Sequence, residues 1–391
     1  MLRSALVGVL LLALGVLGGV LLERRTTLAL LAERSAAGPA ISWTALSPDD
    51  RRVAAIFGIA QIAGVRAAID SLDALARESS NIRARGHAIA HALGRFAVDR
   101  ADGDPAVFAE CRELFQAGCY HGVLEGYFAT RPDADSATVA ALCAAVVRPG
   151  SAPLLRRECA HGLGHGLMGR FGGDVQASLD HCEYAGPPEA RRECFDGVFM
   201  ENAVRATSAL GASSAPGVVL AADTDGEHAH HDGHSDAATA SVAMPMVREG
   251  DPSYPCSSIG APYQASCWSY QPIIALAQLD GDAERAAGVC AAAGAAGMDA
   301  CDQGLGKQML GRRIDEPGAA AAMCRALGGR RTTACLAGIV EGLLDTDWRG
   351  TVAAPFCASL RPPERAACNA AIEERRELLA EGGTSGRGAT S

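Results

Sequence analysis

Fourteen cysteines divide the chain into a regular series of pairs, and this spacing constrains the fold more than any other feature. Four pairs have members 11 residues apart and begin 33 or 34 residues after one another: Cys256/Cys267, Cys290/Cys301, Cys324/Cys335 and Cys357/Cys368. Three pairs with looser spacing precede them: Cys111/Cys119, Cys143/Cys159 and Cys182/Cys194. A constant period of this size indicates an array of structural repeats. An even, regularly paired set also predicts disulfides and an oxidising compartment.

A recurring motif follows the second cysteine of most pairs, as in the stretch Cys159-AHGLGHG. One copy lacks the cysteine and begins at Arg85, 34 residues before Cys119. After each motif comes a polar or Gly/Pro turn, and a short Ala-rich stretch then leads to the next cysteine. This pattern predicts a helix, a turn, a second helix and a loop in each repeat. Glycine inside a helix costs up to about 1 kcal/mol, so its repetition in the motif indicates close packing of helix backbones.

These features predict an all-α fold, an α-solenoid of about seven to eight helical hairpins of ~34 residues with one disulfide per repeat. Each disulfide would join the end of one short helix to the start of the next helix and stabilise a thin core by about 2–3 kcal/mol. Pairing between neighbours is the expectation, although the sequence leaves other pairings open. The architecture resembles disulfide-stapled Sel1-like and TPR-type helical repeat proteins over about residues 50–375. The resemblance implies a helical-repeat fold and says little about function.

The first 25 residues have the features of a targeting segment. An apolar run from Ala5 to Leu22 lies between Arg3 and the pair Arg24 and Arg25. The run is about long enough to span a bilayer. We expect a signal anchor at residues 1–25, a single transmembrane helix, with a cleaved signal peptide as the alternative. The chain would then be anchored in the membrane and face the periplasm or cell exterior, or be secreted if the signal is cleaved.

The remaining chain divides by composition into a linker at 26–48, an N-terminal half-array at 49–205, an insertion at 206–250, a C-terminal half-array at 251–378 and a tail at 379–391. Small and polar residues dominate the insertion, which is predicted to be disordered, as is the tail. The net charge is −10 and Lys307 is the only lysine, so we do not expect a nucleic-acid partner. The surface of a solenoid is a candidate site for a protein partner.

Aligning the repeats reveals histidines and acids at two shared positions, two and six residues after the second cysteine. Residues four apart lie on one helix face, and equivalent faces of adjacent helices line one surface. Imidazoles and carboxylates placed in this way are suitable zinc ligands. The late copies carry Gln303/Lys307, Ala337/Glu341 and Ala370/Glu374 instead. The candidate metal ligands are therefore confined to the first half: His87, His91, His121, Glu125, His161, His165 and Asp196.

A second candidate metal site is the His-rich tract of the insertion, with His228, His230, His231 and His234. Such tracts bind transition metals, although a linker that binds metal only adventitiously is the alternative.

The leading functional hypothesis is binding of a transition metal, zinc or copper first and iron second, for storage or delivery or in a metalloenzyme centre. The sequence does not decide whether the chain is an enzyme. The competing hypothesis is a protein-interaction scaffold with structural histidines and no metal.

Overall fold

The computed structural model describes residues 47–131, 133–209, 247–314 and 316–380. The chain divides into a unit of residues 1–52 and a unit of residues 53–391. The first unit is described only at residues 47–52, where α2 (Pro48–Ala63) begins, so the structure below is that of the second. The predicted signal anchor at 1–25 lies outside the described residues, and within them we find no helix with the length and apolarity needed to cross a membrane.

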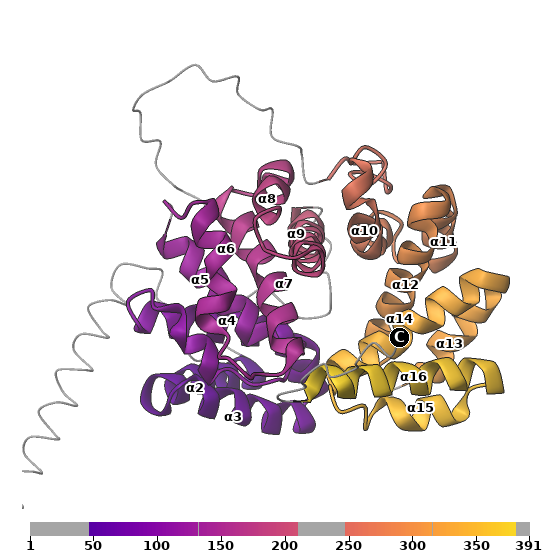
Figure 1. The fold of residues 1–391 in the computed structure, drawn as a ribbon. Coiled ribbons are helices and arrows are strands. Elements are labelled where there is room, and N and C mark those ends of the chain that lie inside the picture. The colour runs from indigo at the N-terminus through magenta and orange to yellow at the C-terminus, as the bar shows by residue number, and fades with distance from the viewer. Residues whose placement is uncertain (1–46, 132, 210–246, 315, 381–391) are drawn as a thin grey trace, which may run out of the picture. The chain divides into compact units, whose positions relative to one another are not determined.

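The described residues form helices joined by turns and contain no β-strand, which confirms the all-α prediction. After α3 (Val65–Glu78), long and short helices alternate (Figure 1). The longer helices are α4 (Ser80–Arg100), α5 (Gly118–Thr130), α7 (Pro153–Arg170), α9 (Pro188–Ala209), α10 (Gln264–Gln278), α12 (Gly294–Arg312), α14 (Gly329–Thr346) and α16 (Pro362–Leu379). The shorter elements are η1 (Pro105–Glu110), α6 (Ser136–Val146), α8 (Val175–Cys182), η2 (Ala261–Tyr263), α11 (Ala283–Ala292), α13 (Pro317–Ala326) and α15 (Ala353–Ser359).

Aspartate residues in the turns start several of the short helices. The side chains of Asp135, Asp174 and Asp282 accept hydrogen bonds from backbone N–H groups in the first turn of α6, α8 and α11. A cap of this kind satisfies donors that have no partner inside the helix. Gly173 and Gly281, directly before two of these caps, have φ of 89° and 79°, a conformation that favours glycine. The Gly-Asp pairs thus turn the chain and begin the next helix.

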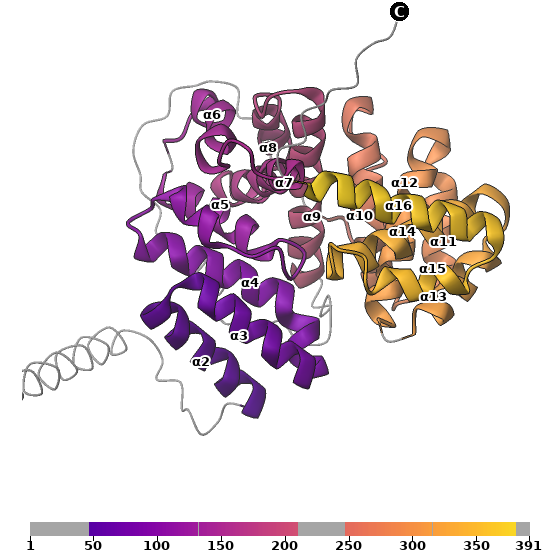
Figure 2. The ribbon, with the colours of Figure 1, turned by 60° about the horizontal axis from the view of Figure 1, so that its bottom comes forward.

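Each long helix packs against the long helices before and after it in the series. The contacts run from α4 through α5, α7, α9, α10, α12 and α14 to α16, and α16 then returns to contact α7 (Figures 1 and 2). Because α9 packs directly on α10, the helices on either side of residues 210–246 are neighbours, joined by a small apolar cluster of Ala203, Ala206 and Ile274. The long helices therefore form one continuous series, in which each helix contacts the next one along the chain.

Seven disulfides join the cysteines in the predicted neighbouring pairs, which leaves no cysteine free. The pairing that the sequence favoured is therefore confirmed over the alternatives that it left open. The bonds are Cys111–Cys119, Cys143–Cys159, Cys182–Cys194, Cys256–Cys267, Cys290–Cys301, Cys324–Cys335 and Cys357–Cys368.

The position of the second cysteine in its helix differs from the prediction. We expected this cysteine at the start of the long helix, but in most repeats it lies inside the helix. The helix α9 begins at Pro188, ahead of Cys194, and α10 begins at Gln264, ahead of Cys267. The same is true of Cys301 in α12, which begins at Gly294, and of Cys335 in α14, which begins at Gly329. Each of these helices thus has an additional N-terminal turn or more, which the disulfide joins to the preceding short element.

Prolines account for three of the early helix starts, and the start of α9 at Pro188 is one of them. Pro153 begins α7 ahead of Cys159, and Pro362 begins α16 ahead of Cys368. Proline has no N–H, and the first residues of a helix do not need one, so proline is favoured at this position. The cysteine motif alone does not contain this signal.

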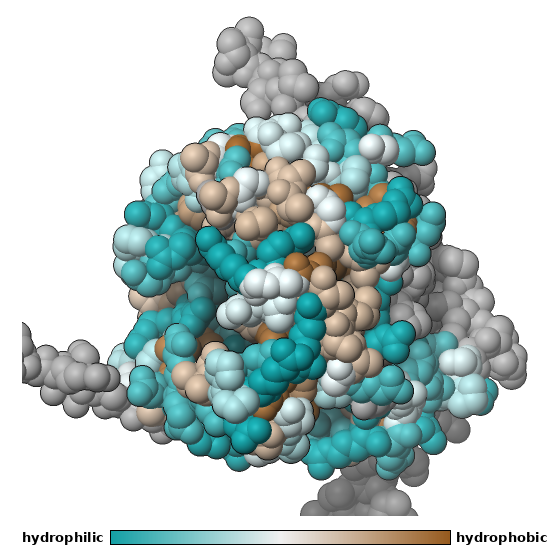
Figure 3. All heavy atoms as spheres, turned by 90° about the vertical axis from the view of Figure 1, so that its right-hand side faces the viewer, coloured by the Kyte–Doolittle hydropathy of each residue, from teal (hydrophilic) through white to brown (hydrophobic). Residues whose placement is uncertain are grey.

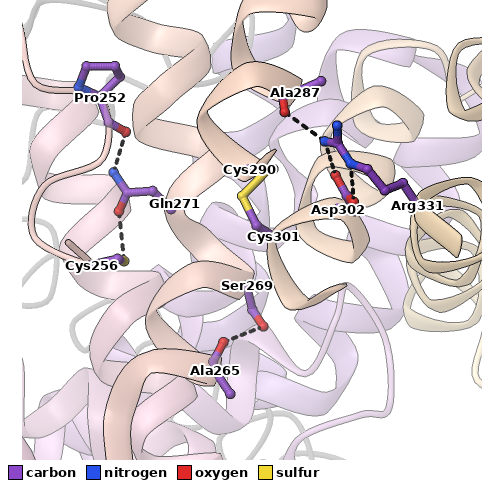
Figure 4. Close-up of a disulfide and its surroundings, with 10 residues drawn as sticks. All are labelled: Pro252, Cys256, Ala265, Ser269, Gln271, Ala287, Cys290, Cys301, Asp302 and Arg331. Atoms are coloured by element: carbon purple, nitrogen blue, oxygen red, sulfur yellow. Dashed lines mark hydrogen bonds and ion pairs between the residues drawn. A yellow bond between two sulfur atoms is a disulfide. The ribbon is translucent and has the colours of Figure 1, made fainter. Parts of the chain in front are cut away.

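An ion pair reinforces the disulfide between Cys290 and Cys301, as Figure 4 shows. Arg331 in α14 donates to both carboxylate oxygens of Asp302 in α12, at 2.8 and 2.6 Å, and to the carbonyl of Ala287 in α11, at 2.7 Å. Asp302 is fully buried, and its charge is satisfied by this two-pronged contact. The arginine therefore joins α14 to both α11 and α12, the two elements that this disulfide connects.

Glycines bring the backbones of neighbouring long helices into direct contact. A Cβ added to Gly304 would lie 2.0 Å from the carbonyl oxygen of Ser269, and one added to Gly338 would lie 1.8 Å from that of Gln303. Real Cβ atoms do not approach an oxygen so closely, so any side chain at these positions would push the helices apart. The repeated glycines are packing residues, in agreement with the sequence pattern.

The disulfide cysteines themselves take part in this packing. A Cβ added to Gly164 would lie 2.2 Å from the carbonyl oxygen of Cys194, and one added to Gly306 would lie 1.9 Å from that of Cys335. The backbone at the second cysteine is therefore in contact with the preceding long helix, while its side chain is bonded to the preceding short element. Each of these cysteines therefore holds its helix against both the preceding long helix and the preceding short one.

We predict that Gly338→Ala destabilises the protein by about 2 kcal/mol or more, because the added methyl group overlaps the backbone of α12 and overpacking typically costs 1–3 kcal/mol. Gly311→Ala is the matched control, since it lies in a helix with no atom within 4 Å of the added Cβ. This control should raise the free energy of unfolding by up to about 1 kcal/mol, because alanine is favoured over glycine inside a helix. Urea unfolding of both variants is the measurement, and equal stability of the two would contradict this packing role.

Candidate metal centre

Six of the seven histidine and acidic side chains predicted as ligands on the helices converge in the structure. They come from three consecutive long helices: His87 and His91 from α4, His121 and Glu125 from α5, and His161 and His165 from α7. Their donor atoms form three overlapping triads, and within each triad all donors lie within 4.8 Å of one another. The triads are His87/His91/His121, His121/His161/His165 and His91/Glu125/His165. Four of the five imidazoles are buried, and His87 is partly buried.

The repeat glycines explain why imidazoles from three helices meet. A Cβ on Gly122 would lie 2.0 Å from the carbonyl oxygen of His91, and one on Gly162 would lie 3.3 Å from the Cα of His121. The helix that carries one histidine pair is therefore pressed against the backbone of the previous pair. As a result, the ring centroids of His91 and His165, which belong to non-adjacent long helices, are only 5.2 Å apart.

Hydrogen bonds to Nδ1 hold three of the rings in a fixed orientation. His87 Nδ1 is 2.8 Å from the carbonyl oxygen of Phe115, and His165 Nδ1 is 3.0 Å from Glu201 Oε2. His91 Nδ1 is 2.7 Å from Glu125 Oε1. Carbonyl and carboxylate oxygens accept, so each Nδ1 carries a hydrogen, and in the neutral form of the ring Nε2 keeps a lone pair. Metal-binding histidines are oriented in this way in proteins.

The two carboxylates that accept these bonds are ionised. Burial alone would raise the pKa of Glu125, but the charge of His91, its hydrogen bond and the charge of Arg95 hold that pKa well below its usual range. Burial likewise opposes ionisation of Glu201, yet the hydrogen bond and charge of His165 lower its pKa. Arg205 also donates to Glu201 at 2.7 Å. The carboxylates are therefore fixed as acceptors facing the centre.

Two imidazole nitrogens of α4 face each other at hydrogen-bond distance. The Nε2 atoms of His87 and His91 are 3.1 Å apart. Burial, and then repulsion from His91, lowers the pKa of His87 to about 3, so this ring is neutral near pH 7. Its Nε2 is a lone pair directed at the Nε2 of His91. A proton on His91 or a metal ion would relieve the repulsion, and two ligand nitrogens of a tetrahedral zinc ion lie about 3.3 Å apart.

Two further imidazole nitrogens favour a bound metal ion over a single shared proton in this cluster. Nδ1 of His121 and Nε2 of His165 are buried and have no hydrogen-bond partner among the described residues. His121 and His165 are only 3% and 2% exposed, and a buried polar atom without a partner costs about 1–3 kcal/mol. One proton between His87 and His91 would leave both of these atoms unsatisfied. A metal bound by the triads would give each of them a partner.

The remaining histidines are also kept in the neutral form that binds metals. Burial lowers the pKa of His121 and of His161 well below the usual range, and the other imidazoles lower both further. His121 Nε2 lies 3.2 Å from Glu158 Oε2, and burial, together with the negative charges of Asp345 and Glu193, raises the pKa of Glu158 to about 8. Neutral imidazoles need no deprotonation before they accept a metal ion.

Asp196 does not join this cluster and belongs to none of the triads. It lines a cavity of about 960 Å³ instead, together with Tyr270, Lys307, Glu341 and Arg375. The ring of Tyr270 approaches that of His161 to 6.5 Å between centroids, so the cavity ends close to the cluster. The repeat positions that carry histidines in α4, α5 and α7 thus carry other polar residues around this cavity. The position of Asp196 does not support a role as a metal ligand.

The cavity lies beside α16, a long helix that lacks the packing glycine found three residues after the cysteine in other repeats. Ala371 in α16 occupies the position three residues after the cysteine, and it lines the cavity. Lys307 and Glu341 also line the cavity and form an ion pair, with Lys307 Nζ 3.3 Å from Glu341, and Lys307 Nζ is 2.6 Å from Asp345. Although burial opposes its charge, these carboxylates hold the pKa of Lys307 well above its usual range. Figure 3 shows the side of the molecule formed by the C-terminal helices, where hydrophilic and apolar residues alternate around a hollow.

Sequence reasoning missed part of the shell around the histidines. Glu158 and the carbonyl of Phe115 were not predicted as partners, because neither occupies a repeat position that the alignment compares. Glu201 lies one residue after the second of the two compared repeat positions, and its bond to His165 joins residues of different repeats. The four histidines of the tract, His228, His230, His231 and His234, lie outside the described residues.

All donors of the cluster are nitrogen or oxygen, since the cysteines are consumed by disulfides. Imidazole-rich sites of this kind suit zinc, copper and iron. Comparisons of the chain with protein-family models, with curated proteins and with solved structures found no match. The chemistry of the site is therefore argued from its geometry alone, and the resemblance to Sel1-like and TPR-type repeats stays a prediction.

Asp196 gives a pH-dependent prediction. Burial, and then the negative charge of Glu193, raises its pKa to about 7. Because the unfolded chain releases this proton near pH 4, the folded protein holds more protons between about pH 4 and 7, and stability falls as the pH rises through that window. Asp196→Asn should remove the fall in the free energy of unfolding that comes from this one carboxyl group, which is up to about 1.4 kcal/mol per pH unit. Urea unfolding in a chelator across this range is the measurement.

The exposed carboxylate of Asp180 provides the matched control in the form of Asp180→Asn, which should keep the pH profile of the original protein. If Asp196→Asn shows the same profile as that control, the raised pKa is not what limits stability at neutral pH.

Proposed function

We propose that the chain is an extracytoplasmic helical-repeat protein that binds a transition metal through the histidine pairs of α4, α5 and α7. The observation that carries the proposal is the 3.1 Å approach of the Nε2 atoms of His87 and His91, together with two buried imidazole nitrogens that lack partners among the described residues. Zinc or copper is the preferred ion and iron the next, because every donor is an imidazole or a carboxylate.

The proposed architecture is an α-solenoid of about seven to eight hairpins, held at residues 1–25 by a membrane anchor and facing the periplasm or the cell exterior. Seven disulfides support an oxidising location, since such bonds persist outside the cytoplasm. The unbroken series of contacts between successive long helices supports the solenoid. Burial of the imidazoles favours an ion that stays resident, as a stored metal or as a catalytic centre, over an ion bound loosely at the surface.

A protein-interaction scaffold is the second candidate function. The cavity of about 960 Å³ beside α14 and α16 favours it, because it combines apolar residues such as Leu336 and Val340 with charged ones such as Arg325 and Glu364. A segment of a partner protein with mixed polarity would fit such a surface. In this function the histidines are structural, and the protein folds and binds its partner without metal.

Metal content tests the leading proposal directly. The full chain is produced in an oxidising compartment with His228, His230, His231 and His234 changed to asparagine, and bound metals are measured by mass spectrometry. We expect stoichiometric transition metal that is lost in the double variant His91→Asn/His165→Asn, since these changes remove a ligand from every triad. His181→Asn is the control, because His181 lies outside the triads and bonds Ala177. A folded, metal-free protein after supplementation with zinc, copper and iron contradicts the proposal.

The acids that orient the rings give a graded prediction. Glu201→Gln leaves His165 in place but removes the charge that accepts its Nδ1–H, which should weaken metal affinity about 10- to 100-fold. The fold should persist, as judged by circular dichroism. Glu373→Gln on the exposed face of α16 is the matched control and should leave affinity unchanged. Competition with a chelator measures both, and equal affinities would show that Glu201 does not support the metal.

A further inference from the structure

The cluster contains more donors than one ion can bind. Six side chains contribute to the three triads, yet among the described residues no four of their donor atoms converge within the same limit. With metal–nitrogen distances near 2.1 Å, all ligands of one ion lie within about 4.2 Å of each other. His87 and His161 share no triad, so these two belong to different ion positions. A single ion would leave about half of the donors without a partner.

Two of the triads each have the spacing that a bound ion requires. Imidazoles on one tetrahedral ion have ring centroids about 5 Å apart. In the first triad the separations are 4.5 Å for His87/His91, 5.3 Å for His91/His121 and 6.0 Å for His87/His121. In the second they are 4.8 Å for His121/His161, 5.2 Å for His121/His165 and 5.1 Å for His161/His165. Both groups therefore match the geometry of ligands around a common centre.

The shared residues link the two positions. His121 is common to both triads, and its Nδ1 is buried without a partner among the described residues. Glu125 Oε1 is 2.7 Å from Nδ1 of His91 and 3.6 Å from Nδ1 of His165, so one carboxylate contacts a ring of each triad. Three carboxylates in all lie within hydrogen-bond distance of the imidazoles, at Glu125, Glu158 and Glu201. The negative charge of Glu125 and Glu201 is what buried divalent ions need for compensation.

We infer that the centre is dinuclear. One divalent transition-metal ion is held by His87 and His91, the other by His161 and His165, and His121 lies between them. The inference rests on the proposed metal-binding function and adds the number and placement of the ions. Each ion has at most three protein donors, which leaves coordination positions on both for water or a small bridging anion. Pairs of ions at short distance clamp substrates in this way in many enzymes.

Copper loading tests the inference without any assay of activity. The full chain, with the four histidines of the insertion changed to asparagine, is saturated with Cu²⁺ alone and freed of excess by gel filtration. Copper per chain is measured by mass spectrometry, and unpaired spins are counted by electron paramagnetic resonance. We expect two ions per chain and a spin count well below the copper count, because two neighbouring Cu²⁺ ions couple magnetically.

The outcomes separate the two proposals. One ion per chain with a full, isolated spin signal overturns the dinuclear centre but leaves the metal-binding function standing. Two ions with two isolated signals also overturn it, since they would be too far apart to form one centre. No bound copper, with no zinc or iron either, counts against the metal-binding function itself.

Single variants assign the two positions. His87→Asn and His161→Asn should each retain one ion, and the spin count should then equal the copper count. His181→Asn, outside the triads, should retain two coupled ions. Circular dichroism checks that each variant is folded. If His87→Asn and His161→Asn both keep two coupled ions, the assignment is overturned.

Discussion

The contact between a helix glycine and the backbone of the preceding long helix is the interaction on which the rest of the structure depends. At Gly122 and Gly197 an added Cβ would lie 2.0 Å from the carbonyl oxygens of His91 and His161. A repeat built from short Ala-rich helices buries little apolar surface, so close backbone packing and a disulfide replace part of what a larger core would supply. The same close packing brings side chains on successive helices within reach of one another. The glycines thus also bring the histidines of α4, α5 and α7 together in the candidate metal centre.

The two halves of the series use that approach for different chemistry. In the first half, the inward positions carry imidazoles. Burial lowers the pKa of His121 and His161, and carboxylates hold the orientation of His91 and His165. In the second half, Lys307 forms ion pairs with Glu341 and Asp345, and Lys307 and Glu341 line a cavity. One half thus gathers imidazoles that could hold a cation, whereas the other pairs a buried cation with carboxylates. The cavity ends near His161 at Tyr270, so the two halves also meet at that point.

Much of the fold follows from local sequence signals. The cysteine period predicted the seven disulfides as found, and it also identified the copy at Arg85, which forms α4. The histidine pairs were found because residues four apart share a helix face. Asp196 and Glu201 were harder to place, because the direction in which successive helices rotate decides which acid reaches a given histidine. That rotation depends on packing along the whole series, and no single repeat encodes it. The helix starts were misplaced for a simpler reason, since the residues ahead of cysteines such as Cys194 and Cys335 are already helical.

The locality of the disulfides has a consequence for how such a chain is made. Every bond joins cysteines between 8 and 16 residues apart, and the pairs follow one another without crossing. Each bond can therefore form as soon as its own repeat emerges during synthesis or export, before distant cysteines are present to compete. Oxidation can proceed in chain order and needs little reshuffling. The histidine cluster, which spans three repeats, would be completed early in that order, with α7, well before the C-terminal helices exist to cover it.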